Sequence, residues 1–155
     1  MQPFMRQPPR LYEPTQSLRL RTIGHAALTA LMPVFYPCGK KVLPETIANI
    51  MADPLAVAVW FMDDGNVKRN SDGDCVGYNL NTQSFTHQEN TTIQRLFWDV
   101  CGIHASVEKN KGYFRIGMYQ KESREKFRDL IKQHVIPSMQ YKLGYVGDSL
   151  RTRRD

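Results

Sequence analysis

Residues 53–65 read DPLAVAVWFMDDG and predict one short helix of unusually apolar composition. Asp53 is a favoured N-cap residue, Pro54 suits the first helical position, and Gly65 is typical of the residue that follows a helix. Every side chain from Pro54 to Met62 is apolar. A helix that is apolar on all sides has to be buried on all sides, so this pattern predicts that one of its faces packs against a partner.

Two adjacent carboxylates, Asp63 and Asp64, close this helix. The C-terminus of a helix carries partial negative charge, which disfavours acidic side chains there by about 0.3–1 kcal/mol each. A bound cation would offset that cost, and hard oxygen ligands favour Mg²⁺ with water and phosphate completing its shell. The alternative interpretation is a pair of solvated turn residues, since Asp before Gly is common in turns.

The sequence after this helix predicts a hairpin and a helix, followed by a second hairpin and a second helix. The hairpins span about 66–83 and 103–119, where apolar and polar side chains alternate. Thr86 and Glu89 form the capping-box pattern that opens the helix between them. With the helix at 54–64, the order αββαββα predicts an α+β fold. Its helices cover one face of a four-stranded antiparallel sheet, and polar, basic and aromatic side chains occupy the other face.

The segments on either side of this pattern predict accessory regions. Residues 1–16 are rich in proline and predict an extended arm, and residues 17–23 alternate as in a half-buried strand. We therefore expect an N-terminal arm at 1–16, a single domain at 17–145 and a basic C-terminal tail at 146–155. Within the domain, residues 17–52 form an N-terminal extension.

Composition narrows the class of protein. The 155 residues carry a formal net charge of +6 and include three cysteines that are far apart. They form no C-x-x-C pair, which argues against a zinc knuckle or a disulfide framework. No stretch has the length and apolarity of a membrane helix or of a secretory signal. The positive surplus favours a polyanionic partner, and we expect an intracellular protein with no membrane partner, in the cytoplasm, the nucleoid or an organelle.

Three segments carry a resemblance to a known family. Residues 54–65, PLAVAVWFMDDG, resemble the signature helix of the LAGLIDADG homing endonucleases, in the branch that writes it P-L-A-x-A-x-W-F-M-D-D-G. NTQSFT at 81–86 and IPSMQYKL at 136–143 match the same branch in the same order. The resemblance runs from about Leu18 to Leu143, and it implies the LAGLIDADG fold with the sheet as a DNA-binding saddle.

The resemblance also implies a mechanism. In the family, two signature helices pack side by side and place their C-terminal acids over the minor groove of DNA. Divalent metal bound by these acids assists hydrolysis of each strand. The cleavage leaves short 3′ overhangs. Asp64 is then a metal ligand with Asp63 in support, and the implied catalytic residues are Asp64, Gln83 and Lys142. The implied cofactor is Mg²⁺, with Mn²⁺ as an alternative, whereas Ca²⁺ is expected to bind without supporting cleavage. Outside this family, Gln83 and Lys142 would be interpreted as ordinary surface residues.

The outward side chains of the two hairpins are the predicted DNA contacts, because a two-stranded ribbon fits the major groove. They are Asn66, Lys68, Arg69, Asn79, Asn81, Gln83, Lys109, Lys111, Tyr113, Arg115 and Tyr119. Small and apolar side chains along the signature helix form the predicted dimer interface. They are Ala52, Leu55, Ala56, Ala58, Val59 and Trp60.

A single signature helix is present, although chains of this branch commonly carry two. Either two copies form a homodimer on a long pseudo-palindromic site, or the chain is a shortened remnant. We favour the homodimer, because the apolar helix requires a partner face. The leading hypothesis is an intron-encoded, site-specific double-strand DNA endonuclease. The alternatives are a maturase that binds its host intron RNA and a catalytically silent DNA-binding protein on the same scaffold.

Overall fold

The computed structural model describes residues 4–144, and the chain divides into two units between Val42 and Leu43. The predicted basic tail at 146–155 lies outside the described residues. Within residues 4–144, no helix has the length and apolarity needed to cross a membrane.

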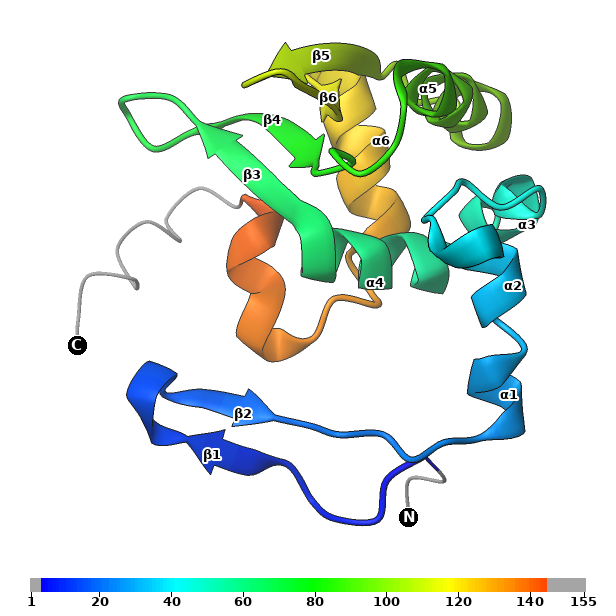
Figure 1. Cartoon of the computed structure of the whole chain (residues 1–155). Coiled ribbons are helices and arrows are strands. Elements are labelled where there is room, and N and C mark those ends of the chain that lie inside the picture. Colours follow the sequence, from blue (N-terminus) through cyan, green and yellow to red (C-terminus); the bar gives the residue numbers. More distant parts are fainter. Residues whose placement is uncertain (1–3, 145–155) are drawn as a thin grey trace. The chain divides into compact units, whose positions relative to one another are not determined.

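The larger unit contains the predicted alternation of helices and hairpins (Figure 1). Its elements are α3 (Ile47–Met51), α4 (Pro54–Asp64), β3 (Gly65–Arg69), β4 (Cys75–Leu80), α5 (His87–Cys101), β5 (Ser106–Asn110), β6 (Tyr113–Met118), α6 (Lys121–Ile131) and the 3-10 helix η3 (Pro137–Leu143). The four strands form one antiparallel sheet in the order β3-β4-β6-β5. From α4 to α6 the order is αββαββα, which confirms the predicted fold class.

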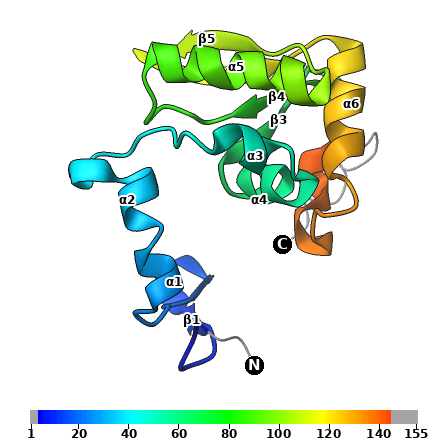
Figure 2. The ribbon, with the colours of Figure 1, turned by 90° about the vertical axis from the view of Figure 1, so that its right-hand side faces the viewer.

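The core of this unit lies between the sheet and its helices, and Figure 2 shows α5 running along the sheet. Phe61 of α4 meets Tyr78 of β4 and Phe127 of α6 edge to face, with ring centroids 5.6 and 5.1 Å apart. Phe97 of α5 contacts the same Phe127 ring. Since all four side chains are fully buried, one aromatic cluster joins α4, α5 and α6 to the same face of the sheet.

Most of the predicted helix ends are confirmed. The Asp53 side chain accepts a hydrogen bond from the Leu55 N–H and caps α4. Thr86 and Glu89 form a complete capping box at the start of α5. That helix ends at Gly102, whose φ of +62° belongs to the left-handed region that favours glycine.

Gly65 follows α4 as predicted, but it does not take the left-handed conformation that glycine most often adopts there. Gly65 has φ −90° and ψ 154°, an extended conformation, and it is already the first residue of β3. A Cβ atom at Gly65 would lie 2.0 Å from the Phe61 ring and 2.5 Å from the Phe61 carbonyl oxygen. Glycine is therefore required here by close approach of the backbone to Phe61, and the helix passes into the strand without a loop.

The smaller unit is formed by short elements. They are β1 (Arg10–Tyr12), η1 (Glu13–Thr15), β2 (Ser17–Arg19), α1 (Ala26–Thr29), α2 (Met32–Phe35) and η2 (Pro37–Gly39). β1 and β2 pair as a hairpin, so the predicted boundary after residue 16 falls in the turn of that hairpin, and the units divide at 42/43 instead. α1 and α2 are separate short helices, and Pro33 occupies the first turn of α2, where a proline is tolerated.

Replacing Gly65 with alanine is expected to lower the free energy of unfolding by about 1–3 kcal/mol, because the new methyl group overlaps the Phe61 ring and backbone. Urea unfolding followed by circular dichroism measures the change. Gly24→Ala is the matched control, since a Cβ atom at Gly24 meets nothing within 4 Å. Equal stability of the two variants would contradict this account of the junction.

Candidate active site and nucleic-acid interface

Asp64 lies at the point where α4 becomes β3. Gly65 pairs with Leu80, the last residue of β4. This pairing brings the following residue, Asn81, beside Asp64. The Asn81 N–H donates to the Asp64 carbonyl oxygen at 3.0 Å. Asp64 is half-buried and Asp63 is exposed. The direct passage from helix to strand thus fixes the backbone of the predicted metal ligand against the end of β4.

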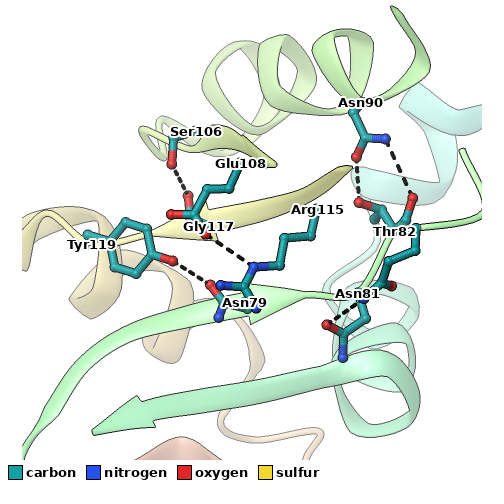
Figure 3. Close-up of polar contacts among 10 residues, drawn as sticks. Asn79, Asn81, Thr82, Asn90, Ser106, Glu108, Arg115, Gly117 and Tyr119 are labelled. Atoms are coloured by element: carbon teal, nitrogen blue, oxygen red, sulfur yellow. Dashed lines mark hydrogen bonds and ion pairs between the residues drawn. The ribbon is translucent and has the colours of Figure 1, made fainter. Parts of the chain in front are cut away.

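Gln83 follows β4 in the loop that leads to α5. Its amide nitrogen donates to the Asn81 side-chain oxygen at 3.3 Å, so the predicted catalytic amide is linked through Asn81 to the end of α4. Figure 3 shows how this loop is tied to α5 by Thr82 and Asn90. The fully buried Asn90 amide donates to the carbonyl oxygens of Phe85 and Thr86 at 3.2 and 2.9 Å.

Thr82 and Asn90 were absent from the predicted site. The Thr82 hydroxyl donates to the Asn90 side-chain oxygen, and both side chains are buried. Buried polar groups are stable only when hydrogen-bonded, so this network gives the loop a defined shape. A sequence signal exists: Asn90 lies three residues before Ile93 and seven before Phe97, on the apolar stripe of α5, where a polar residue needs an explanation.

Lys142, from η3, reaches the same end of α4. Its ammonium group donates to the Met62 carbonyl oxygen at 2.6 Å and to the Gly65 carbonyl oxygen at 2.9 Å, and the side chain is half-buried. These two carbonyls flank Asp63 and Asp64 in the chain. A cation at the C-terminus of a helix interacts favourably with the helix dipole. Lys142 therefore supplies part of the charge compensation that the two acids require.

The structure thus gathers Asp64, Gln83 and Lys142 around one helix end. Among the described residues, no group of three or more His, Cys, Asp or Glu side chains could hold a metal ion. Mg²⁺ is usually held by one or two carboxylates and takes its other ligands from water and phosphate. The carboxylates of Asp63 and Asp64 therefore fit a Mg²⁺ shared with a phosphate, and they do not fit a closed site made by one chain.

The face of the sheet opposite the helices is covered in its centre by Tyr119. A Cβ atom at Gly77 or Gly117 would lie 2.4 or 2.6 Å from the Tyr119 ring, so the ring occupies space that the two glycines leave open. Its hydroxyl donates to the Asn79 side-chain oxygen at 2.7 Å, and burial raises the pKa of Tyr119 to about 12. On this face the Lys68 ammonium group lies 5.0 Å from the ring centroid.

Three predicted DNA contacts are placed differently from the prediction. Asn79 belongs to the outward row but is only 2% exposed, because Tyr119 covers it, and it is not available to a base edge. Arg69 lies on the Val67 side of β3, and its guanidinium donates to the Gly73 carbonyl oxygen at 2.7 Å. Lys109 pairs with Phe114, whose ring contacts His87 of α5, so Lys109 belongs to the helix-facing row and is exposed near the hairpin turn.

The other predicted contacts remain on or near the outward face. Arg115 forms an ion pair with Glu108, a residue absent from the predicted site, at 3.1 Å from Nε to Oε2 (Figure 3). Asn81 and Gln83 are half-buried beside the acid. Apart from Lys109, the exposed members of the predicted set are Asn66, Lys68, Lys111 and Tyr113.

Within the described residues of the larger unit, one face of α4 has no packing partner. Leu55 and Val59 are 48% and 52% exposed and lie four residues apart, about one helical turn. Ala56 is half-buried and Ala52 is exposed beside them. Ala58 is fully buried in the core of its own chain, so its inclusion in the predicted dimer interface is wrong.

Trp60, the sixth member of the predicted interface, is half-buried and packs against the core. The apolar character of α4 therefore has two causes. Val57, Ala58 and Phe61 are buried within the chain, and Leu55 and Val59 form the exposed row.

Comparisons with known proteins identify the family of the chain. The model of the LAGLIDADG DNA endonuclease family matches residues 2–127. The chain is 30% identical over 132 residues to a probable intron-encoded DNA endonuclease 3 of Mycosarcoma maydis, a match that covers 83% of this chain and 93% of that protein. It is 33% identical over 111 residues to the cytochrome b mRNA maturase bI2 of Debaryomyces hansenii, covering 71% of this chain and 40% of the maturase.

A solved structure, that of the homing endonuclease I-WcaI bound to its DNA recognition sequence, is similar with a TM-score of 0.79 and 25% sequence identity. The match covers 90% of this chain and 65% of that chain, so this chain spans less than two thirds of the solved endonuclease. The family match covers most of the sequence, and the folds agree. The chain therefore belongs to the LAGLIDADG DNA endonuclease family, a family of DNA-cleaving hydrolases.

Proposed function

We propose that this chain is a metal-dependent, site-specific DNA endonuclease that acts as a homodimer and is encoded within an intron. The observation that carries the proposal is the meeting of Asp64, Gln83 and Lys142 at the end of a helix whose exposed row is apolar. An intracellular location, where DNA is present, is part of the same proposal.

The homodimer follows from the number of acids and from the exposed face of α4. The part of the chain that the structure describes supplies one such helix end, whereas cutting both strands of a duplex requires two. A second copy packed against Leu55 and Val59 would bury two large apolar side chains and bring a second Asp64 close to the first. The small side chains of Ala52 and Ala56 allow a close approach of the two helices. A two-fold symmetric dimer matches a pseudo-palindromic target.

The site residues have separate roles in this proposal. Asp64, supported by Asp63, would hold Mg²⁺ at the site of reaction, and Mn²⁺ is an alternative ion. When bound, the metal supplies Lewis-acid stabilisation of negative charge on the phosphate. The Gln83 amide orients the attacking water by hydrogen bonding. Hydrolysis of each strand by one site leaves short 3′ overhangs.

Lys142 is suited to contact the phosphate because of its donor count. A lysine ammonium group has three N–H donors, and the Met62 and Gly65 carbonyls accept two hydrogen bonds from it. One donor is left for an oxygen of the scissile phosphate. Held in this way, the positive charge is already in position before the reaction begins, which is the arrangement that stabilises developing charge most effectively.

DNA binding in this proposal uses the outward face of the sheet. Lys68 and Lys111 contact phosphates and supply affinity, whereas Asn66 and Tyr113 reach base edges or sugars. Tyr119 and Arg115 are half-buried on the same face. The Arg115 guanidinium contacts a base only through the part that is not engaged in the ion pair with Glu108.

A maturase is the second candidate, because the chain is similar to a cytochrome b mRNA maturase. In that function the same basic surfaces bind intron RNA, and the two acids have no chemical role. Asp64 therefore discriminates between the two functions.

Replacing Asp64 with asparagine is expected to lower the rate of DNA cleavage by roughly a hundredfold or more, because the amide cannot hold a divalent cation as a carboxylate does. The substrate is a duplex that joins the two sequences flanking the intron that encodes the chain. Single-turnover cleavage is measured with Mg²⁺, and affinity for the same duplex is measured with Ca²⁺.

The affinity serves as the control, since Asp64→Asn is expected to leave the dissociation constant within about twofold while cleavage is lost. Unchanged cleavage by Asp64→Asn would exclude the proposed catalytic role. Binding of the intron RNA without any cleavage of the duplex by the wild-type chain would favour the maturase.

Replacing Val59 with lysine is expected to convert the dimer to a monomer, because it places a charge in the centre of the proposed apolar interface. Size-exclusion chromatography with light scattering at micromolar concentration measures the mass. Val100→Lys on α5 is the matched control, since Val100 is also exposed, at 39%, and lies on a different helix. A wild-type chain that is monomeric at this concentration would contradict the proposed homodimer.

A further inference from the structure

Lys142 is anchored through its own backbone as well as through its ammonium group. It lies in η3, and its neighbours on either side are Tyr141 and Leu143. A lysine side chain is long and flexible, so a defined position of its nitrogen requires a fixed backbone and fixed acceptors. The acceptors are the Met62 and Gly65 carbonyls described above.

Two side chains from the sheet hold the peptide groups on the two sides of Lys142. The Tyr78 hydroxyl of β4 donates to the Leu143 carbonyl oxygen in the interior of the protein. The Arg69 guanidinium of β3 donates to the Tyr141 carbonyl oxygen at 3.4 Å. Arg69 is itself held, because its other terminal nitrogen donates to the Gly73 carbonyl oxygen at 2.7 Å.

The environment of Tyr78 makes its hydroxyl a fixed donor. The side chain is fully buried and packs edge to face on the Phe61 ring, and burial raises its pKa. Its target is equally fixed: Leu143 is 1% exposed. The following residue, Gly144, has φ +71°, and a Cβ atom there would lie 2.8 Å from the Cys75 Cβ atom. Only glycine allows η3 to end this close to the sheet.

We propose that Tyr78 and Arg69 are positioning residues that place the Lys142 ammonium group at the end of α4, and that Arg69 acts in this way instead of as a DNA contact. The inference rests on the proposed function, in which Lys142 contacts the scissile phosphate. A displacement of a catalytic group by about 1 Å can lower a rate by about a hundredfold, so loss of one anchor has a measurable effect.

The test replaces Tyr78 with phenylalanine, which removes the hydroxyl and retains the buried ring. The expected result is a single-turnover cleavage rate in Mg²⁺ lowered by roughly tenfold to a hundredfold, with affinity for the duplex in Ca²⁺ within about twofold of wild type. Tyr141→Phe is the matched control: it removes a hydroxyl from a 47% exposed tyrosine of η3 and leaves the Tyr141 carbonyl in place. It is expected to cleave at the wild-type rate.

A double-mutant cycle with Lys142→Met separates positioning from a general effect on the fold. If Tyr78 acts through Lys142, Tyr78→Phe lowers the rate in the wild-type background and has no further effect once Lys142 is methionine. A structural effect on the whole domain would lower the rate by the same factor in both backgrounds, and that result would overturn the proposal. Arg69→Lys, which keeps the charge but not the geometry, is tested in the same cycle and is expected to behave as Tyr78→Phe does.

Failure of the proposed function gives a different result from failure of this inference. Absence of cleavage by the wild-type chain overturns the proposed function and the inference together. A wild-type rate in Lys142→Met leaves the endonuclease function standing and overturns the proposed role of Lys142 and, with it, the inference. Cleavage that depends on Lys142 but is unchanged in Tyr78→Phe and Arg69→Lys overturns the inference alone. A loss of duplex affinity in Arg69→Lys that matches its loss of rate would return Arg69 to the DNA contacts.

Discussion

The contact between Phe61 and Gly65 is the constraint on which the rest of the site depends. The chain passes from α4 into β3 without a loop, and only glycine fits at this junction, because the Phe61 ring and carbonyl leave no room for a Cβ atom. That junction sets the pairing of Gly65 with Leu80, and the pairing in turn places Asn81 beside Asp64. The same phenylalanine belongs to the aromatic cluster of the core, so the position of the acid is coupled to the packing of the whole unit.

Charge at the end of α4 is balanced from a distant part of the sequence. Two carboxylates at a helix C-terminus are unfavourable, and the Lys142 ammonium group meets the carbonyls that flank them. The compensation depends on η3 being held against the sheet, where Gly144 ends it with a left-handed residue.

Sequence patterns predicted well those features that depend on neighbours in the chain. The capping residues Asp53 and Thr86 are confirmed, because helix starts are decided by local hydrogen bonds and backbone preference. Alternation in the strands gave the correct rows for most residues. It could not reveal that Asn79 is covered, because the covering Tyr119 ring comes from the end of another strand and lies across Gly77 and Gly117.

The sequence by itself determined the αββαββα order, the family and the identity of the acids at the end of the signature helix, since each of these lies in a contiguous pattern. Only the tertiary structure decided which apolar residues of α4 are used internally, as Ala58 is, and which remain exposed, as Leu55 and Val59 do. It also decided that the Arg69 guanidinium donates to the carbonyl oxygens of Gly73 and Tyr141. The physical reason is that burial and hydrogen-bond partners depend on residues that are far away in the chain. A pattern read from neighbouring residues does not include them.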